Sequence, residues 1–195
     1  MPDLSPITAL GGTTARTVEH GALTLEENTG LALASLALRR GTTEPAPFGL
    51  GLPGPGRWTG NDTAAALWTG PGQWLFEGPG RAGSDFAATV AAACPGCSVT
   101  EQTDGFAAFE VRSAAGEAPI LALMAKLVNL DTARFGPGAA TRTGLGHMSV
   151  FVIRRATDRL AVIGMRSAAA TLWHALETAA ARRAIADGDA TAEAA

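Results

Sequence analysis

The two cysteines of this 195-residue chain, Cys94 and Cys97, are separated by Pro-Gly, the spacing of a redox dithiol or of half a zinc site. Zinc needs four ligands, and the sequence holds no second cysteine pair to supply them. A reactive dithiol is favoured at a helix N-terminus, where the helix dipole lowers the thiol pKa. The stretch SDFAATVAAA before Cys94 instead predicts a helix that ends at the pair, where the dipole opposes a thiolate. We therefore interpret CPGC as a helix-ending turn.

A second candidate is GLGLPG, in which Gly49, Gly51 and Gly54 match the dinucleotide-binding pattern G-x-G-x-x-G. That site requires the glycines to lie between a strand and a helix whose N-terminus meets the pyrophosphate. Pro53 and Pro55 interrupt the pattern, and no helical period follows at once. A structural loop is the better interpretation, so we assign no cofactor-binding residue.

The remaining residues that could act as acids or bases are isolated in the sequence. Three aspartates lie at expected turns, where Asp is common because it forms hydrogen bonds with the backbone. An acid/base role for them stays open, but nothing pairs them. One histidine lies within a strand pattern and one beside Trp173 on an expected helix, and neither has a partner nearby in the sequence. We therefore assign no catalytic residue and no metal ligand. The residues considered are Asp104, Asp131, Asp158, His147 and His174.

Hydrophobic period and turn residues predict the elements that would position these groups. Ser84 and Asp85 are expected to cap a helix, and Asp104-Gly105 is expected to join two strands as a hairpin. A Pro/Gly-rich loop is expected between the first two strands. The predicted strands are 31–39, 62–70, 73–79, 97–103, 105–113, 142–155 and 158–165, and the predicted helices are 82–93, 117–128 and 167–185.

This order of hairpins and intervening helices predicts an α+β fold of antiparallel sheets, with helices on one side and ferredoxin-like units. Residues 1–30 are polar and aperiodic, so we expect an N-terminal arm that is ordered mainly by contact with another chain. Residues 31–185 are expected to form a single α+β domain. Residues 186–195 are small and acidic and are expected to form a flexible tail.

Composition narrows the classes of partner. A net charge of −3 gives no general basic field for nucleic acid or for an anionic membrane. No apolar run approaches the roughly 20 residues of a membrane helix, and the N-terminus lacks the basic region of a secretory signal. We expect a cytoplasmic protein. The charged fraction of 17% is low, which suits a surface covered by other chains.

Several longer motifs resemble the gamma subunit of heterotetrameric sarcosine oxidase, and the resemblance runs from Leu31 to Leu176. The tryptophan turn W-x-G-P-x-x-W-L, the loop L-D-x-x-x-F-x-P-G followed by R-T, and the ending R-S-A-x-x-L-W are each fairly specific. They stand here within LWTGPGQWLF (67–76), NLDTARFGPGAATRT (129–143) and RSAAATLWHAL (166–176).

The resemblance implies a shortened relative of the folate-binding aminomethyltransferase fold. It implies an accessory, non-catalytic subunit of an enzyme that demethylates sarcosine to glycine, hydrogen peroxide and 5,10-methylenetetrahydrofolate. FAD, FMN, NAD, tetrahydrofolate and zinc are then expected in the alpha, beta and delta partner subunits, with no cofactor in this chain. Two alternatives stay open. One is a self-standing folate-binding or aminomethyltransferase-like protein, and the other is an accessory subunit of an oxidase for another N-methyl amine.

The tryptophan turn offers a candidate surface for such partners. Trp68 and Trp74 flank a tight turn, so they are expected on neighbouring strands, packed with Phe76 in one aromatic cluster. The cluster either closes the sheet over a helix or turns one tryptophan toward a partner subunit, where aromatic residues are enriched. Trp68, Trp74 and Phe76 are therefore our candidate partner interface.

Overall fold

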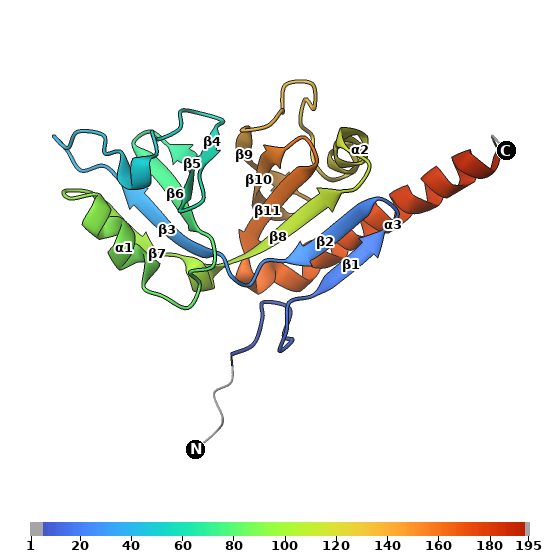
Figure 1. Cartoon of the computed structure of the whole chain (residues 1–195), viewed down its shortest axis with the longest axis horizontal. Coiled ribbons are helices and arrows are strands. Elements are labelled where there is room, and N and C mark those ends of the chain that lie inside the picture. The colour runs from blue at the N-terminus through green and yellow to red at the C-terminus, as the bar shows by residue number, and fades with distance from the viewer. Residues whose placement is uncertain (1–5, 194–195) are drawn as a thin grey trace, which may run out of the picture.

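The computed structural model describes residues 6–193, with side chains to residue 185. The chain forms two antiparallel sheets, which lie side by side as two halves of the molecule (Figure 1). One sheet has six strands in the order β1-β2-β8-β11-β10-β9, and the other has five in the order β4-β5-β6-β3-β7. The expected α+β class with antiparallel sheets is confirmed.

The elements within the described residues have the following bounds. The strands are β1 (Thr17–His20), β2 (Leu23–Glu27), β3 (Ala32–Ala37), β4 (Trp58–Gly60), β5 (Ala65–Gly70), β6 (Gln73–Gly78), β7 (Ser98–Glu101), β8 (Phe106–Ser113), β9 (Ala140–Leu145), β10 (Met148–Ala156) and β11 (Arg159–Met165). The helices are α1 (Phe86–Ala93), α2 (Glu117–Leu127) and α3 (Ala169–Glu193), and the short 3-10 turns are Pro47–Gly49, Thr103–Gly105 and Arg166–Ala168.

Alternation along the strands divides the core into three layers of packing. On β10, Val150 and Val152 face α2 and α3, whereas Phe151 and Ile153 face the other sheet. The five-stranded sheet packs its opposite face on α1. The core residues of these layers include Phe109, Ile120 and Trp173 under α2 and α3, then Leu33, Leu67 and Ile163 between the sheets, and Leu36, Phe76 and Phe86 under α1.

The N-terminal region is part of this core, which corrects the expectation of a separate arm over residues 1–30. β1 and β2 extend the six-stranded sheet, with β2 paired to β8. Leu23 and Leu25 are buried against the helices. The period of two in L-T-L-E-E carries this strand, although polar neighbours obscure it. Residues 1–5 lie outside the described residues.

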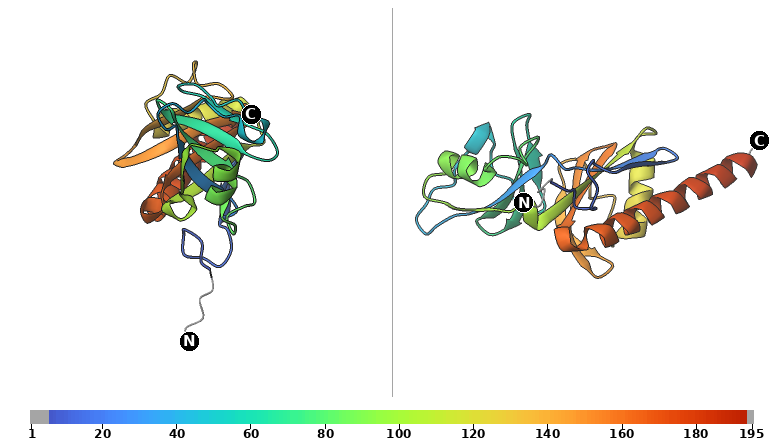
Figure 2. Two further views of the ribbon diagram at one scale, coloured as in Figure 1. Left: turned by 90° about the vertical axis from the view of Figure 1, so that its left-hand side faces the viewer. Right: turned by 90° about the horizontal axis from the view of Figure 1, so that it is seen from below.

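The C-terminal boundary also differs from the expectation. The expected last helix, 167–185, begins with a 3-10 turn, and the α3 backbone then continues through Glu193. Most of the expected tail, 186–195, is therefore helical, while the side chains of these residues lie outside those described. Figure 2 shows α3 running past the edge of the sheet and beyond α2.

The hairpin expected at Asp104-Gly105 is wrong. β7 pairs with β3 in one sheet, whereas β8 pairs with β2 and β11 in the other. The chain therefore changes sheets at the turn Thr103–Gly105. β8 is apolar on both faces and needs a central position, whereas mostly exposed β7 suits an edge.

Two further strands were not resolved by the sequence patterns. β4 lies within the expected Pro/Gly loop and pairs with β5. β9 and β10, expected as one strand, form a hairpin that turns at residues 146–147. Within the described residues, no helix combines the length and the apolar character needed to span a membrane.

The packing of β2 makes a direct prediction. Replacing Leu25, which is 0% exposed, by Ala should lower the free energy of unfolding by about 2–5 kcal/mol, because a cavity opens beneath α3. Ile7→Ala is the control, since Ile7 is 61% exposed and its truncation should change stability by no more than about 0.5 kcal/mol. Urea unfolding of the isolated chain measures both variants. Equal effects would contradict a core that includes β2.

Candidate functional site

The predicted aromatic cluster forms, and it packs on α1. Trp68 lies opposite Trp74 across the β5–β6 pair. Trp74 is buried and donates its indole N–H to the Pro53 carbonyl at 2.8 Å, and Phe76 is fully buried beside Phe48. Trp74 and Phe76 are therefore inside the chain and present no surface to a partner. Half-buried Trp68 is the member of the set that could reach one, and that role stays a prediction.

The cysteines lie where the sequence predicts. Cys94 is the C-terminal cap of α1, and its helix begins at Asp85, whose carboxylate accepts the Ala88 N–H at 2.8 Å. Both thiols are free, with Cys94 buried and Cys97 half-buried. Burial, and then the nearby Cys97, raises the pKa of Cys94 to about 11. A thiol with this pKa is protonated at neutral pH, which makes it a poor nucleophile.

The other candidate residues are scattered over the molecule. Gly49, Gly51 and Gly54 precede the strand β4 rather than a helix. His147 lies exposed in the β9–β10 turn rather than within a strand, and His174 lies exposed on α3. Among the described residues, no three His, Cys, Asp or Glu side chains are grouped closely enough to hold a metal ion.

The three aspartates occupy turns, as expected. Asp104 lies exposed in the turn that connects the two sheets. Asp131 accepts the Ala133 N–H at 3.1 Å and lies 3.4 Å from the Arg134 guanidinium. Asp158 belongs to the tight connection between β10 and β11. The three turns belong to separate connections of the chain: Asp104 lies between β7 and β8, Asp131 between α2 and β9, and Asp158 between β10 and β11.

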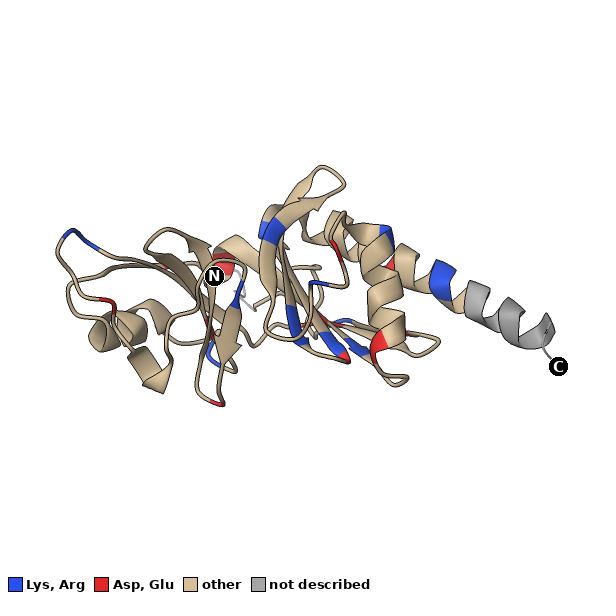
Figure 3. Cartoon of the chain, turned by 90° about the horizontal axis from the view of Figure 1, so that it is seen from above, with Lys and Arg blue, Asp and Glu red and all other residues tan. Residues whose placement is uncertain are grey.

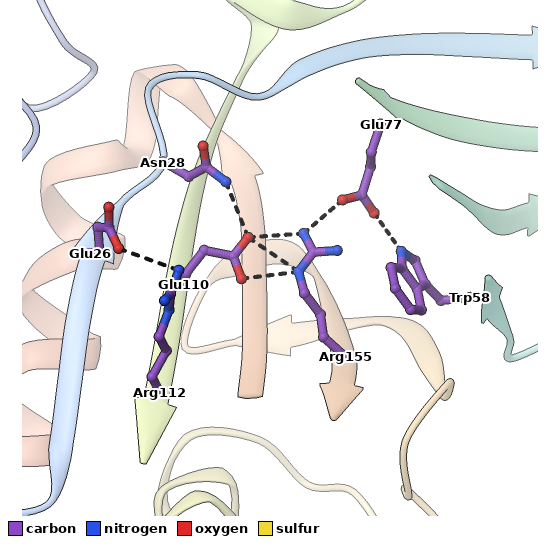
Figure 4. Close-up of polar contacts among 7 residues, drawn as sticks. All are labelled: Glu26, Asn28, Trp58, Glu77, Glu110, Arg112 and Arg155. Atoms are coloured by element: carbon purple, nitrogen blue, oxygen red, sulfur yellow. Dashed lines mark hydrogen bonds and ion pairs between the residues drawn. The ribbon is translucent and has the colours of Figure 1, made fainter. Parts of the chain in front are cut away.

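The structure instead brings together an ionic cluster between the two sheets, shown in Figure 4. Arg155 of β10 binds Glu110 of β8 through a fork, with its Nε 3.0 Å from Oε2 and its Nη2 3.0 Å from Oε1. The same Nη2 lies 2.7 Å from Oε2 of Glu77 on β6. One guanidinium therefore joins a carboxylate of each sheet.

Two neutral donors complete the cluster. The Trp58 indole N–H donates to the other Glu77 oxygen at 2.9 Å, and the Asn28 amide donates to Glu110 at 3.2 Å. The Arg155 guanidinium also lies over the Trp58 ring, 5.4 Å from its centre. Glu77 is 1% exposed, so these contacts replace almost all of its hydration.

Strand alternation and one bulge place these side chains. Glu77 follows Leu75 by two positions, and Glu110 likewise follows Ala108, so both carboxylates face the contact between sheets. The register of β10 shifts between Arg154 and Ala156. Arg155 is the extra residue of this bulge, a device that aims a side chain out of the regular ladder.

Strand alternation sends the two neighbouring arginines to opposite faces of β10. Arg154 points to the other face of β10, where it is fully buried and pairs with Glu117 of α2 at 3.1 Å. It also donates to the Thr157 carbonyl within the β10–β11 connection. Two consecutive residues therefore tie β10 to the facing sheet on one side and to α2 on the other.

The electrostatics of the cluster favour a fixed charge over proton transfer. Burial lowers the pKa of the Arg155 guanidinium, but the charges of Glu77 and Glu110 outweigh burial and hold that pKa above its ordinary value. Every carboxylate oxygen of Glu77 and Glu110 already accepts a hydrogen bond. A general base needs an oxygen that can reach a substrate proton. We call Arg155, Glu77 and Glu110 the latch, because their ionic contacts join the two sheets.

A pterin-type ligand needs a deep pocket with a carboxylate inside. Two pockets of the described residues can be compared with this requirement. A pocket of about 290 Å³ lies where the chain crosses between sheets, and the carboxylates of Glu27 and Asp104 line it. Both Glu27 oxygens are occupied by backbone N–H groups of Leu10 and Arg16. A larger groove of about 630 Å³ beside α3 has no carboxylate among its lining residues. Of the two pockets, the first therefore offers an exposed carboxylate, that of Asp104, and the second offers none.

The fold has relatives among solved structures, although the sequence matches no family model and no curated protein. Among solved structures, the chain is similar to a chain of the heterotetrameric sarcosine oxidase from Corynebacterium sp. U-96 in complex with pyrrole 2-carboxylate. The TM-score is 0.69 at 21% identity, over 85% of this chain and 87% of that chain.

A second similar structure is the glycine cleavage system aminomethyltransferase T from Bartonella henselae. The TM-score is 0.56 at 13% identity, over 84% of this chain and 50% of that chain. The chain shares its fold with these two proteins. The expected relation to the aminomethyltransferase fold is therefore confirmed, with this chain spanning half the length of that transferase.

The sequence did contain a signal for the latch that was missed. Three charged residues stand at strand positions where the alternation calls for an apolar side chain, in strands that are otherwise largely buried on both faces. They are Glu77, Glu110 and Arg155. Such residues are almost never fully buried unless they are paired. Their presence predicts a partner for each, although local pattern does not say which.

Removing the latch cation should be costly. Arg155→Met leaves Glu77 buried without its counter-charge and should lower the free energy of unfolding by about 3–5 kcal/mol. Adding Glu77→Gln should recover part of this loss, because the Gln oxygen still accepts the Trp58 N–H. Arg112→Met is the control, since its pair with Glu26 spans 3.9 Å on the surface and should contribute less than about 1 kcal/mol. If the effects of Arg155→Met and Glu77→Gln on the free energy of unfolding simply add, the proposed latch is contradicted.

The Cys94 thiol predicts a pH dependence of stability. The folded chain holds this proton up to about pH 11, whereas the unfolded chain releases it near its ordinary pKa of 9.0. The free energy of unfolding should therefore be unaffected below pH 9 and fall by up to roughly 3 kcal/mol between pH 9 and 11.

Denaturant titration across that pH range measures the effect. Cys94→Ala should flatten the fall, whereas Cys97→Ala should retain most of it, because burial is the larger cause. A fall of equal size in the Cys94→Ala variant would show that another group is responsible.

Proposed function

We propose that this chain is the accessory, non-catalytic gamma-type subunit of a heterotetrameric sarcosine oxidase. The observation that carries the proposal is the extent of the structural match, which spans 85% of this chain and 87% of a chain from such an oxidase. The match to the aminomethyltransferase covers only 50% of that enzyme. Similarity over nearly the whole of both chains favours a subunit of the oxidase type over a free transferase.

The geometry of the described residues supports a structural role. The most deeply buried carboxylates, Glu77 and Glu27, are saturated with internal hydrogen bonds. Each holds two parts of the chain together: Glu77 joins the sheets, and Glu27 fixes the segment that precedes β1. Rigidity of this kind suits a subunit whose surface must match its neighbours.

In this proposal, the chemistry belongs to the partner subunits. Oxidation of an amine requires a two-electron acceptor, which flavins supply and side chains do not. FAD, FMN, NAD, tetrahydrofolate and zinc would bind the alpha, beta and delta subunits of a cytoplasmic complex. Sarcosine would yield glycine, hydrogen peroxide and 5,10-methylenetetrahydrofolate. An oxidase for another N-methyl amine would use an accessory chain of the same kind, because its amine would also be recognised elsewhere.

Reconstitution tests the proposal. The purified chain should be colourless and should release no peroxide from sarcosine. Added to the alpha, beta and delta subunits, it should co-migrate with them and increase peroxide release, through an interface on the order of 2,000 Å² or more. An unrelated protein of similar size serves as the control, and dimethylglycine tests the choice of amine. A yellow chain, peroxide formed by the chain alone, or failure to join the complex would each contradict the proposal.

A further inference from the structure

A groove of about 630 Å³ lies beside the middle of α3. The end of α2 and the β9–β10 turn form its other walls. Half-buried Leu127, Ala175 and Ala179 form an apolar floor that continues outward from the core. The volume lies within the range of about 300–1,000 Å³ that is usual for bound groups.

The rim of this groove is basic. Lys126, His174 and Arg182 line it, and all three are exposed. Figure 3 shows basic residues at the end of α2 and on the neighbouring part of α3. The lining includes no Asp or Glu, although the whole chain has a net charge of −3. This concentration of positive charge therefore runs against the overall balance.

The described side chains supply little negative charge to balance the basic residues of the rim. Among the side chains described, neither Lys126 nor Arg182 has a carboxylate within ion-pair distance. Lys126 lies in the last turn of α2, where a cation stabilises the helix dipole. That explanation does not extend to Arg182, which lies well before the end of α3.

The groove also opens onto a helix that leaves the body of the molecule. α3 continues past the sheet, and Ile185 on its exposed part has 65% of its surface accessible. A ligand in the groove would therefore meet an apolar floor, a basic rim and a projecting helix. Small anions do not use an apolar floor, and single-stranded nucleic acid favours aromatic platforms, of which this lining has none.

We propose that this groove is a docking surface for an acidic amphipathic helix of a partner protein. Apolar side chains of the helix would pack on Leu127, Ala175 and Ala179, while its carboxylates would face Lys126 and Arg182. Charge complementarity selects this partner, because the rim is basic while the remainder of the chain is net acidic. The inference goes beyond the proposed function and does not depend on which oxidase the chain serves.

Fluorescence anisotropy of the full chain with a labelled model peptide tests the surface. The probe is an amphipathic helix of Glu and Leu, about 18 residues or five turns long. We expect saturable binding that weakens as NaCl rises from about 50 to about 500 mM, because the contacts to the rim are screened. A peptide with Gln in place of Glu should bind about tenfold more weakly.

Paired charge reversals locate the site. Lys126→Glu with Arg182→Glu should weaken peptide binding about tenfold or more. Arg40→Glu with Arg57→Glu is the matched control, because both residues are exposed in the other half of the molecule and the change in net charge is the same. Circular dichroism checks that each variant is folded, and the salt and Gln-peptide measurements need no variant at all.

Four outcomes would overturn the proposal. The first is no binding of the Glu peptide, and the second is equal loss in both charge-reversed pairs. The third is displacement of the peptide by tripolyphosphate or oligo-dT at lower concentration than by unlabelled peptide. The fourth is sedimentation of the chain as a dimer that only Lys126→Glu with Arg182→Glu dissociates, which would assign the groove to a second copy.

Discussion

The contact of one guanidinium with two carboxylates links the halves of this molecule. Arg155 reaches Glu110 within its own sheet and Glu77 in the facing sheet, at distances of 3.0 and 2.7 Å. Ten buried apolar residues of the described part of the chain lie between the sheets, compared with 21 in the core under α2 and α3. Apolar contact is not directional, whereas the hydrogen bonds of the guanidinium fork are, so the cluster adds a defined geometry to the contact between the sheets.

The ionic cluster bears on the proposed function because it holds the two sheets in a fixed arrangement. The matched part makes up only half of the similar transferase, whereas it makes up most of this chain, which is held together by internal contacts. Glu77 and Glu27 are both used for that purpose. Carboxylates committed to these contacts are not free to move protons, which is in keeping with the proposed accessory role. The candidate surfaces for a partner are half-buried Trp68 and the basic groove beside α3.

Local features could be predicted from the sequence because they depend on residues that are close together in the chain. Asp85 caps α1, CPGC ends that helix, and Trp68 meets Trp74 across a tight turn, all as their spacing predicts. The strand β2 was missed because two buried leucines in a polar stretch give a weak period. The β7–β8 hairpin was wrong because Asp104-Gly105 reports a turn and not the partners of the strands that leave it.

The sequence by itself determined the α+β class, the C-terminal end of α1 and the faces of the strands that it identified, since these follow from turn residues and from periods of two or 3.6 residues. Only the tertiary structure decided which strands share a sheet and which charges meet. Arg155 is 45 positions from Glu110 and 78 from Glu77, so no local period relates them. Their pairing arises when folding buries both carboxylates and the only favourable arrangement places the cation between them.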